Sequence, residues 1–237
     1  MFRKWLFSFL SVPAFGLLYI YMALGVLVLI PILLLGLRKL GLRMMEGWSK
    51  SMFYIIGRRL HYHGLENIDK NGRYIVVANH SSLFDILAII SIFPGLSWFG
   101  HERLTKVPVF KHILKLINYV PMRKATIAST KQMMGQLVEN SQGHTIGIFP
   151  EGTRSLDGRL NDFYRGFVIL LRNANIDVLP VTLKGFFSLK PKNRFYIGFD
   201  TKLDVIVHQP IARINLLDKS DIEIISKIGR ASCRERV

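Results

Sequence analysis

Cysteine and acidic side chains are both scarce in this sequence. The 237-residue chain holds one cysteine, which excludes a disulfide scaffold and any cysteine-rich zinc module. Its 16 Asp and Glu residues are outnumbered by 32 Lys and Arg residues, which gives a formal net charge of +16. Such an excess predicts an anionic partner: nucleic acid, an anionic membrane surface or a phosphorylated ligand. Half of the residues are hydrophobic, so general disorder is excluded.

Several common catalytic and binding motifs are missing too. The chain has no G-x-S-x-G nucleophile elbow, no Walker A loop and no G-x-G-x-x-G dinucleotide motif. His61 and His63 alternate onto one face of an extended segment, but no third ligand accompanies them, so we predict no metal site. Because the basic residues are scattered and no zinc-finger, helix-turn-helix or RNA-binding signature is present, we predict no nucleic-acid partner.

A long apolar run fills the N-terminus. From Trp5 to Leu37 the chain has 33 residues without a charge, and lysines or arginines flank the run on both sides. As one helix it would be about 50 Å long, against roughly 30 Å of bilayer hydrocarbon. Two arrangements fit this length: a single span over residues 15–37 after a short interfacial helix over residues 3–11, or a bent helical hairpin within one leaflet. Either arrangement predicts membrane attachment.

Composition divides the chain into three parts. Residues 1–60 are predicted to hold membrane-anchoring helices followed by an amphipathic connector. In residues 61–227, short apolar runs alternate with helical patterns, which predicts an α/β domain with a mostly parallel central sheet flanked by helices. Residues 228–237 (IGRASCRERV) resemble a translated sequencing adapter, so we predict that this tail and its cysteine are not native. The predicted strands cover residues 74–78, 96–100, 145–149 and 178–183, and the predicted helices cover residues 83–92, 110–117, 126–141 and 164–173.

A histidine and an aspartate follow the first buried strand of this domain. His80 lies at the end of the run at residues 74–78, where α/β sheets bind ligands, and Asp85 comes five residues later. On a regular helix the two side chains would be about 140° apart, so His80 must lie in the turn before the helix for the carboxylate to reach it. Ser81 or Ser82 as an N-cap would supply that break. Asp85 would then orient the imidazole and leave its other nitrogen as a base, although this spacing alone is also typical of a capping histidine.

A second polar string follows another predicted strand. In residues 149–155 (FPEGTRS), proline and glycine bend the chain at the strand end. Arg154 can bind a phosphate bidentately, while Thr153 and the loop amides can donate to it. Glu151 can accept a hydrogen bond from a glycerol hydroxyl. On its own, the string would equally describe a polar loop with a solvated arginine.

The two strings in this order, about seventy residues apart, resemble the motifs of the glycerolipid acyltransferase family. The resemblance covers residues 60–185 and the apolar N-terminus, and the most similar members are the bacterial 1-acyl-sn-glycerol-3-phosphate acyltransferases. It implies that His80 is the general base and that Asp85 orients it. A further family block corresponds to residues 120–123, of which only the arginine carries over, and the family's fourth block resembles residues 178–181. The substrate-binding residues that the resemblance implies are Arg123, Glu151, Gly152, Thr153 and Arg154.

The resemblance also implies a function in phospholipid biosynthesis. The expected reaction moves an acyl chain from acyl-CoA or acyl-carrier protein to the sn-2 hydroxyl of lysophosphatidic acid, forming phosphatidic acid. The thioester is a co-substrate, and no cofactor or metal is expected. Transfer is expected to be direct, with Ser81 or Ser82 as nucleophile the covalent alternative. The expected location is the bacterial inner membrane with the active site facing the cytoplasm. Two alternatives stay open: another acceptor (glycerol-3-phosphate, another lysophospholipid or an amino-acid lipid), or a nonenzymatic binder of anionic lipid.

Overall fold

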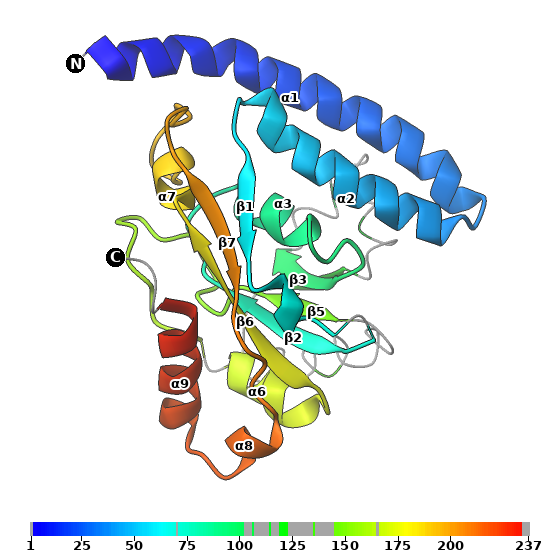
Figure 1. Ribbon diagram of the computed structural model, residues 1–237, viewed down its shortest axis with the longest axis vertical. Helices are drawn as coiled ribbons and strands as arrows, with labels where there is room; N and C mark the ends of the chain where they lie inside the picture. The colour runs from blue at the N-terminus through cyan, green and yellow to red at the C-terminus, as the bar shows by residue number, and fades with distance from the viewer. Residues whose placement is uncertain are drawn as a thin grey trace.

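The computed structural model describes residues 2–69, 71–101, 106, 114, 119–122, 135, 145–164 and 166–233. Within these residues, seven strands form one sheet in the order β1-β7-β6-β2-β5-β3-β4 (Figure 1). Neighbouring strands are parallel except for β6 and β7, which are antiparallel. The α/β fold with a mostly parallel sheet is therefore confirmed. The strands are β1 (Leu60–His63), β2 (Tyr74–Ala78), β3 (Ser97–His101), β4 (Val120–Met122), β5 (Ile146–Ile148), β6 (Asp177–Lys184) and β7 (Leu203–Val207).

Helices cover both faces of the sheet. The sequence of β2, YIVVA, is buried throughout, and its alternation sends Tyr74, Val76 and Ala78 into one core and Ile75 and Val77 into the other. The first core is closed by α1 (Phe2–Leu34), α2 (Arg38–Ile55), α3 (Asp85–Ile90) and α7 (Phe186–Leu189). The second is closed by α6 (Gly166–Asn173), α8 (Ile214–Leu217) and α9 (Asp221–Cys233). A short 3-10 helix, η1 (Leu65–Asn67), follows β1.

The apolar N-terminus forms one continuous helix. Pro13 and Pro31 both lie inside α1, so the predicted break between a short interfacial helix and a span is wrong. A hairpin does form, but its second arm is α2, beyond a turn at Gly36 whose φ is +75°. The arms approach closely at Gly25, because a Cβ there would lie 2.3 Å from the Trp48 side chain. Among the described residues, α1 is one helix that is long and apolar enough by length and composition to cross a membrane.

The predicted elements of the globular part mostly match the structure. The strand at residues 74–78 is β2 to the residue, and the strands predicted at residues 96–100, 145–149 and 178–183 correspond to β3, β5 and β6. The helices predicted at residues 110–117 and 126–141 lie outside the described residues, apart from one residue in each. Helix α9 continues through Ile228, which is fully buried, as far as Cys233. The proposed boundaries at residues 60 and 227, and the origin of the tail, stay predictions.

Candidate active site

The contact between His80 and Asp85 predicted from the sequence is present at the carboxyl end of β2, and the catalytic role of the pair stays a prediction. His80 Nδ1 lies 2.9 Å from Asp85 Oδ2, and α3 begins at Asp85, so the histidine precedes the regular helix as the geometry requires. The carboxylate is fully buried, whereas the imidazole keeps some exposure to solvent. An ionised carboxylate only accepts hydrogen bonds, which assigns the shared proton to Nδ1 and leaves Nε2 as the basic nitrogen.

The aspartate holds the turn between the two residues, and Ser82 contributes one further hydrogen bond. Asp85 Oδ2 accepts hydrogen bonds from the backbone N–H groups of Ser81 at 2.6 Å and Ser82 at 2.7 Å. The N-cap position of α3 is Phe84, which makes no side-chain cap hydrogen bond, so neither serine is the N-cap of the regular helix. The Ser82 hydroxyl does accept from the backbone N–H of Phe84 at 3.3 Å, so a serine contributes to the turn that precedes the helix. One carboxylate oxygen therefore fixes both the chain path and the imidazole, because three donors converge on it.

The imidazole ring is also held from the side. It stacks on the ring of Phe149 with centroids 4.1 Å apart and planes 14° from parallel. Trp98 stacks on the same phenylalanine at 5.5 Å. Phe149 opens the FPEGTRS string, so the second motif supplies a wall for the histidine of the first.

A buried carboxylate joins the two motifs. Glu151 Oε1 accepts from the backbone N–H of His80 at 2.7 Å, and Oε2 accepts from the backbone N–H of Asn161 at 2.9 Å. In addition, the backbone N–H of Ser155 donates to the carbonyl of His80 at 2.8 Å. The strings that are about seventy residues apart in sequence thus share direct hydrogen bonds. Glu151 is 1% exposed, a geometry that favours a positioning role over contact with a substrate hydroxyl; the latter stays a prediction.

Gly152 shapes the turn after Glu151. Its φ is +64°, and a Cβ at this position would lie 2.7 Å from the Tyr164 ring. A side chain would therefore be strained by the backbone and would also collide with the ring. The glycine lets the loop double back so that Thr153 and Arg154 follow directly on the surface.

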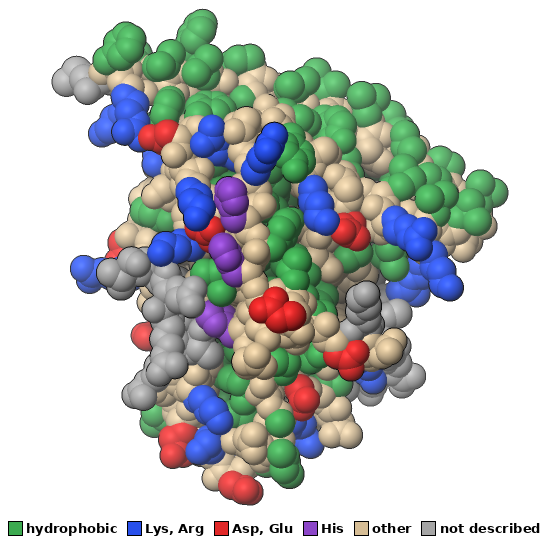
Figure 2. Space-filling model, in the orientation of Figure 1, with side chains coloured by type: hydrophobic (Ala, Val, Ile, Leu, Met, Phe, Trp, Pro, Cys, Tyr) green, Lys and Arg blue, Asp and Glu red, His purple; other side chains and the backbone are tan. Residues whose placement is uncertain are grey.

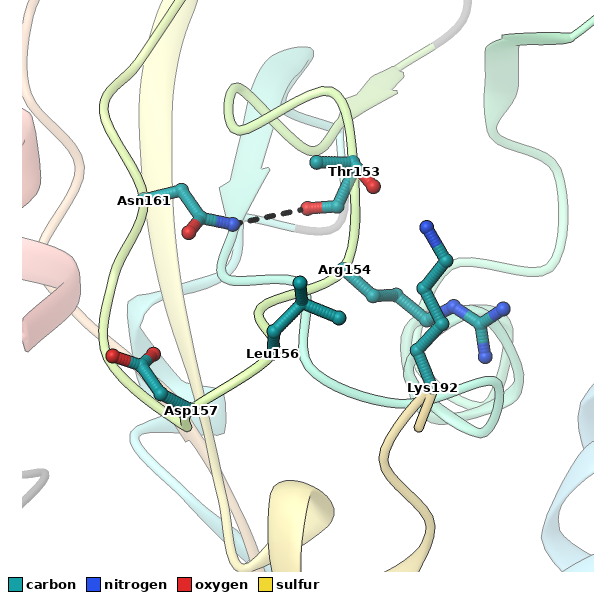
Figure 3. Close-up of a pocket in the computed structure, with 6 residues that line it drawn as sticks. All are labelled: Thr153, Arg154, Leu156, Asp157, Asn161 and Lys192. Carbon is teal, nitrogen blue, oxygen red and sulfur yellow. Dashed lines mark hydrogen bonds between the residues drawn. The ribbon is translucent and has the colours of Figure 1, made fainter. Parts of the chain in front are cut away.

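Thr153 and Arg154 line an open hollow of about 400 Å³ (Figure 3). In Figure 3 the Arg154 side chain extends toward the side chain of Lys192, which lines the same hollow. The turn at residues 190–194 (KPKNR) was not predicted as part of the site, although its three basic residues within five positions are a visible signal. The predicted phosphate contact Arg123 lies outside the described residues.

Asn79 fixes the strand ends beneath the site. Its side chain donates to the carbonyl of Leu183 at 3.0 Å and accepts from the N–H of the same residue at 2.7 Å. These bonds clamp the carboxyl end of β2 to β6 where the His80 turn begins. Elsewhere, His63 bonds Asp204 at 3.0 Å, and the described part of the chain shows no group of three or more His, Cys, Asp or Glu residues placed to hold a metal ion.

Comparison with known proteins matches this arrangement to one family. The family model described as Acyltransferase matches residues 59–184, which is more than half of the chain and includes both motifs. The chain belongs to the acyltransferase family. The resemblance of the two strings to glycerolipid acyltransferases is thereby confirmed.

Individual acyltransferases are similar over most of the chain. The crystal structure of the 1-acyl-sn-glycerophosphate acyltransferase of Thermotoga maritima superposes with a TM-score of 0.79 at 27% identity, covering 98% of this chain and 94% of that one. The 1-acyl-sn-glycerol-3-phosphate acyltransferase of Borreliella burgdorferi is 28% identical over 81% of this chain and 77% of its own length. The chloroplast enzyme of the same name from Arabidopsis thaliana is 28% identical over 65% of this chain, but the match spans only 44% of that protein.

Proposed function

We propose that the protein transfers an acyl chain from acyl-CoA or acyl-carrier protein to the sn-2 hydroxyl of lysophosphatidic acid. The observation that carries this proposal is the junction of the two motifs: an Asp85-oriented His80 whose backbone is bonded to the loop that bears Arg154. A base for a hydroxyl and a cation for a phosphate are the two groups that this acceptor requires. The names of the relatives support the same acceptor.

The transfer takes place in one step on the enzyme. His80 Nε2 accepts the proton of the sn-2 hydroxyl while the hydroxyl oxygen attacks the thioester carbonyl. The thiolate that leaves then accepts this proton from the imidazolium. Asp85 stabilises the transient imidazolium. General-base assistance of this kind contributes roughly 10²–10⁴-fold to the rate. The acceptor phosphate lies against Arg154, with Arg123 as the further expected contact.

The neighbouring serines favour direct transfer over a covalent intermediate. Both Ser81 and Ser82 are buried, and the Ser82 hydroxyl donates to the carbonyl of Lys190 at 2.9 Å. A hydroxyl committed to a backbone carbonyl is not activated as a nucleophile by His80.

The membrane is the proposed partner of α1. Figure 2 shows apolar side chains along the outer edge of the molecule, where α1 lies in Figure 1. Trp5 and Phe9 are among the residues most exposed on this edge, at 73% and 76%. The opposite face of α1 docks on the domain: the Ser11 hydroxyl accepts from the N–H of Ile197, and Phe7 packs on Phe199. A helix held along its length in this way supports embedding in one leaflet, with the site at the cytoplasmic surface where both donors occur.

The test is phosphatidic acid formation by purified protein in lipid vesicles. Lysophosphatidic acid is supplied with acyl-CoA or with acyl-carrier protein, and the product is followed by mass spectrometry. We expect turnover with at least one donor, and a loss of about 10²–10⁴-fold in His80→Ala with vesicle binding unchanged. Product from another acceptor alone would assign that acceptor, and binding without turnover would assign a nonenzymatic lipid binder. A stable labelled acyl-enzyme would overturn direct transfer.

A further inference from the structure

The turn at residues 190–194 is fixed against the catalytic motif. The carbonyl of Lys190 accepts the Ser82 hydroxyl at 2.9 Å, although 108 positions separate the two residues. Residues farther along the same segment dock on α1, through the bond between Ile197 and Ser11. The turn therefore has a defined position beside the His80 motif.

Two of its three cations hold the turn itself. Lys190 Nζ donates to the carbonyl of Pro191 at 3.1 Å and to the carbonyl of Arg194. The Arg194 guanidinium donates to the carbonyl of Leu189 at 2.9 Å. The third cation, Lys192, is exposed and makes no hydrogen bond or ion pair with any residue that the structure describes. Its ammonium group is thus available to a ligand.

Positive charge is concentrated here without a matching carboxylate. Burial lowers the pKa of Lys190, and the charges of Arg154 and Arg194 lower it further. Within the described ranges, no ion pair neutralises Arg154 or Lys192. Cations that line the same hollow repel, and a bound anion relieves that repulsion.

Asp157 is the one carboxylate among the residues that line the hollow, and it lies apart from the two cations. It is lined by Thr153, Arg154, Leu156, Asp157, Asn161 and Lys192. In Figure 3, Leu156 lies between Asp157 and the two cations. The Asp157 carboxylate accepts from the N–H of Arg159 at 2.9 Å and from the Ser155 hydroxyl at 3.1 Å, so its own loop uses it.

We propose that Lys192 is a further phosphate-binding cation, which contacts the acceptor phosphate together with Arg154 in the hollow that both residues line. The inference rests on the proposed function and deepens it, because it makes the site selective for a phosphate monoester. A monoester carries a charge of about −1.5 to −2 at pH 7, so it gains more from each added cation than a singly charged group does. A phosphodiester or a phosphocholine headgroup carries only one negative charge on its phosphate and therefore gains less from Lys192.

The experiment compares Lys192→Ala with Arg73→Ala in the full-length protein. Arg73 is exposed just before β2, at the sheet end opposite His80, and its loss changes the net charge equally. We expect Lys192→Ala to raise KM for lysophosphatidic acid about tenfold, the effect of losing one charged hydrogen bond, with kcat and the KM for the donor unchanged. Lys192→Arg should restore most of the affinity, and Arg73→Ala should match the wild type. Unfolding curves establish that all variants are folded.

The outcomes separate this inference from the function it rests on. Absence of turnover in the wild type would overturn the proposed function. Normal turnover with an unchanged KM in Lys192→Ala would overturn only the role of Lys192. If Lys192→Ala raised the KM for acyl-CoA and left the KM for lysophosphatidic acid unchanged, Lys192 would be assigned to the phosphates of the donor. That outcome would overturn the acceptor assignment. The selectivity ratio of lysophosphatidic acid over lysophosphatidylcholine should fall by the same factor as the affinity.

Discussion

The carboxyl end of the sheet and helix α1 differ in how many hydrogen bonds their polar side chains make. At the sheet edge, the buried carboxylates of Asp85 and Glu151 each accept at least two hydrogen bonds from backbone N–H groups. Along α1, polar contacts are few, with Ser11 the buried example, and the outer face is apolar. Hydrogen bonds fix the conformation of the first region, whereas apolar contacts and an apolar outer face characterise the second. Catalytic geometry should therefore respond sharply to single polar substitutions at the sheet edge, whereas α1 should tolerate most apolar exchanges.

The sharpest test of the comparison is Glu151→Ala. The change removes the acceptor of two N–H groups, those of His80 and Asn161, whose hydrogen bonds are partly buried, at a cost of about 2–5 kcal/mol of unfolding free energy. Turnover should fall together with stability, because the His80 backbone loses one of its two hydrogen bonds to the Arg154 loop. Urea unfolding and acyl-transfer assays measure the two effects. Glu151→Gln keeps one acceptor oxygen, so its stability and turnover should lie between those of the wild type and Glu151→Ala. A Glu151→Ala variant as stable as the wild type would contradict the structural role of Glu151 in joining the two motifs.

Ser11→Ala tests whether one polar contact anchors the docked face of α1. Its hydroxyl accepts from the Ile197 N–H at 2.8 Å and donates to the Phe7 carbonyl at 2.5 Å. Loss of these bonds should destabilise the protein by about 1–2 kcal/mol and increase amide exchange at Ile197.

The matched control is Ser8→Ala on the same helix. Ser8 makes no hydrogen bond with any described residue, so its replacement should leave both stability and exchange near the wild-type values. Equal behaviour of the two variants would mean that apolar packing alone holds α1 in place.

The smallest effect is expected at Asp204 on β7, which lies between β1 and β6 and away from the site. Burial alone would raise the pKa of Asp204, but hydrogen bonds from His63 and Lys202 outweigh burial and lower it below the usual range. A carboxyl whose pKa is lowered in the folded state adds stability above about pH 4 and loses it as the pH falls through the folded pKa. Asp204→Asn should therefore reduce stability at neutral pH by less than about 1 kcal/mol, since both partners are largely exposed.

Unfolding measured from pH 7 to pH 2 checks the sign of this effect. The difference between Asp204→Asn and the wild type should shrink toward zero in acid, where the wild-type carboxylate becomes protonated. A difference that stays constant across this range would point to a cause other than the charge of Asp204.

Local patterns predicted the centre of the fold and the contact between His80 and Asp85. The run YIVVA gave β2 to the residue because a strand buried on both faces needs consecutive apolar residues. His80 and Asp85 lie within six positions, so their contact depends on one turn that sequence spacing describes well. Neither serine is the N-cap, because the regular helix begins later, at Asp85; the Ser82 hydroxyl instead accepts from the N–H of Phe84 in the preceding turn.

The rest depended on which strands become neighbours. Asn79 meets Leu183, and Ser82 meets Lys190, only because β6 pairs with β2. Strand order is a property of the whole chain, and no local pattern around residues 190–194 encodes it. Likewise β4 contains Pro121, which obscured a strand that lies at the edge of the sheet. The roles of these residues depend on their positions in the sheet, which residue type alone does not predict.

The docking of α1 has a practical consequence for the preparation of soluble protein. Truncation at residue 35 would take Leu18 and Leu29 out of the core that also holds β2, and would leave the Ile197 amide without its hydroxyl acceptor. Because the same segment carries Lys192, a shortened enzyme would lose support for one wall of its ligand cavity along with its proposed attachment to lipid. Inactivity of such a fragment would therefore report damaged architecture as much as missing bilayer.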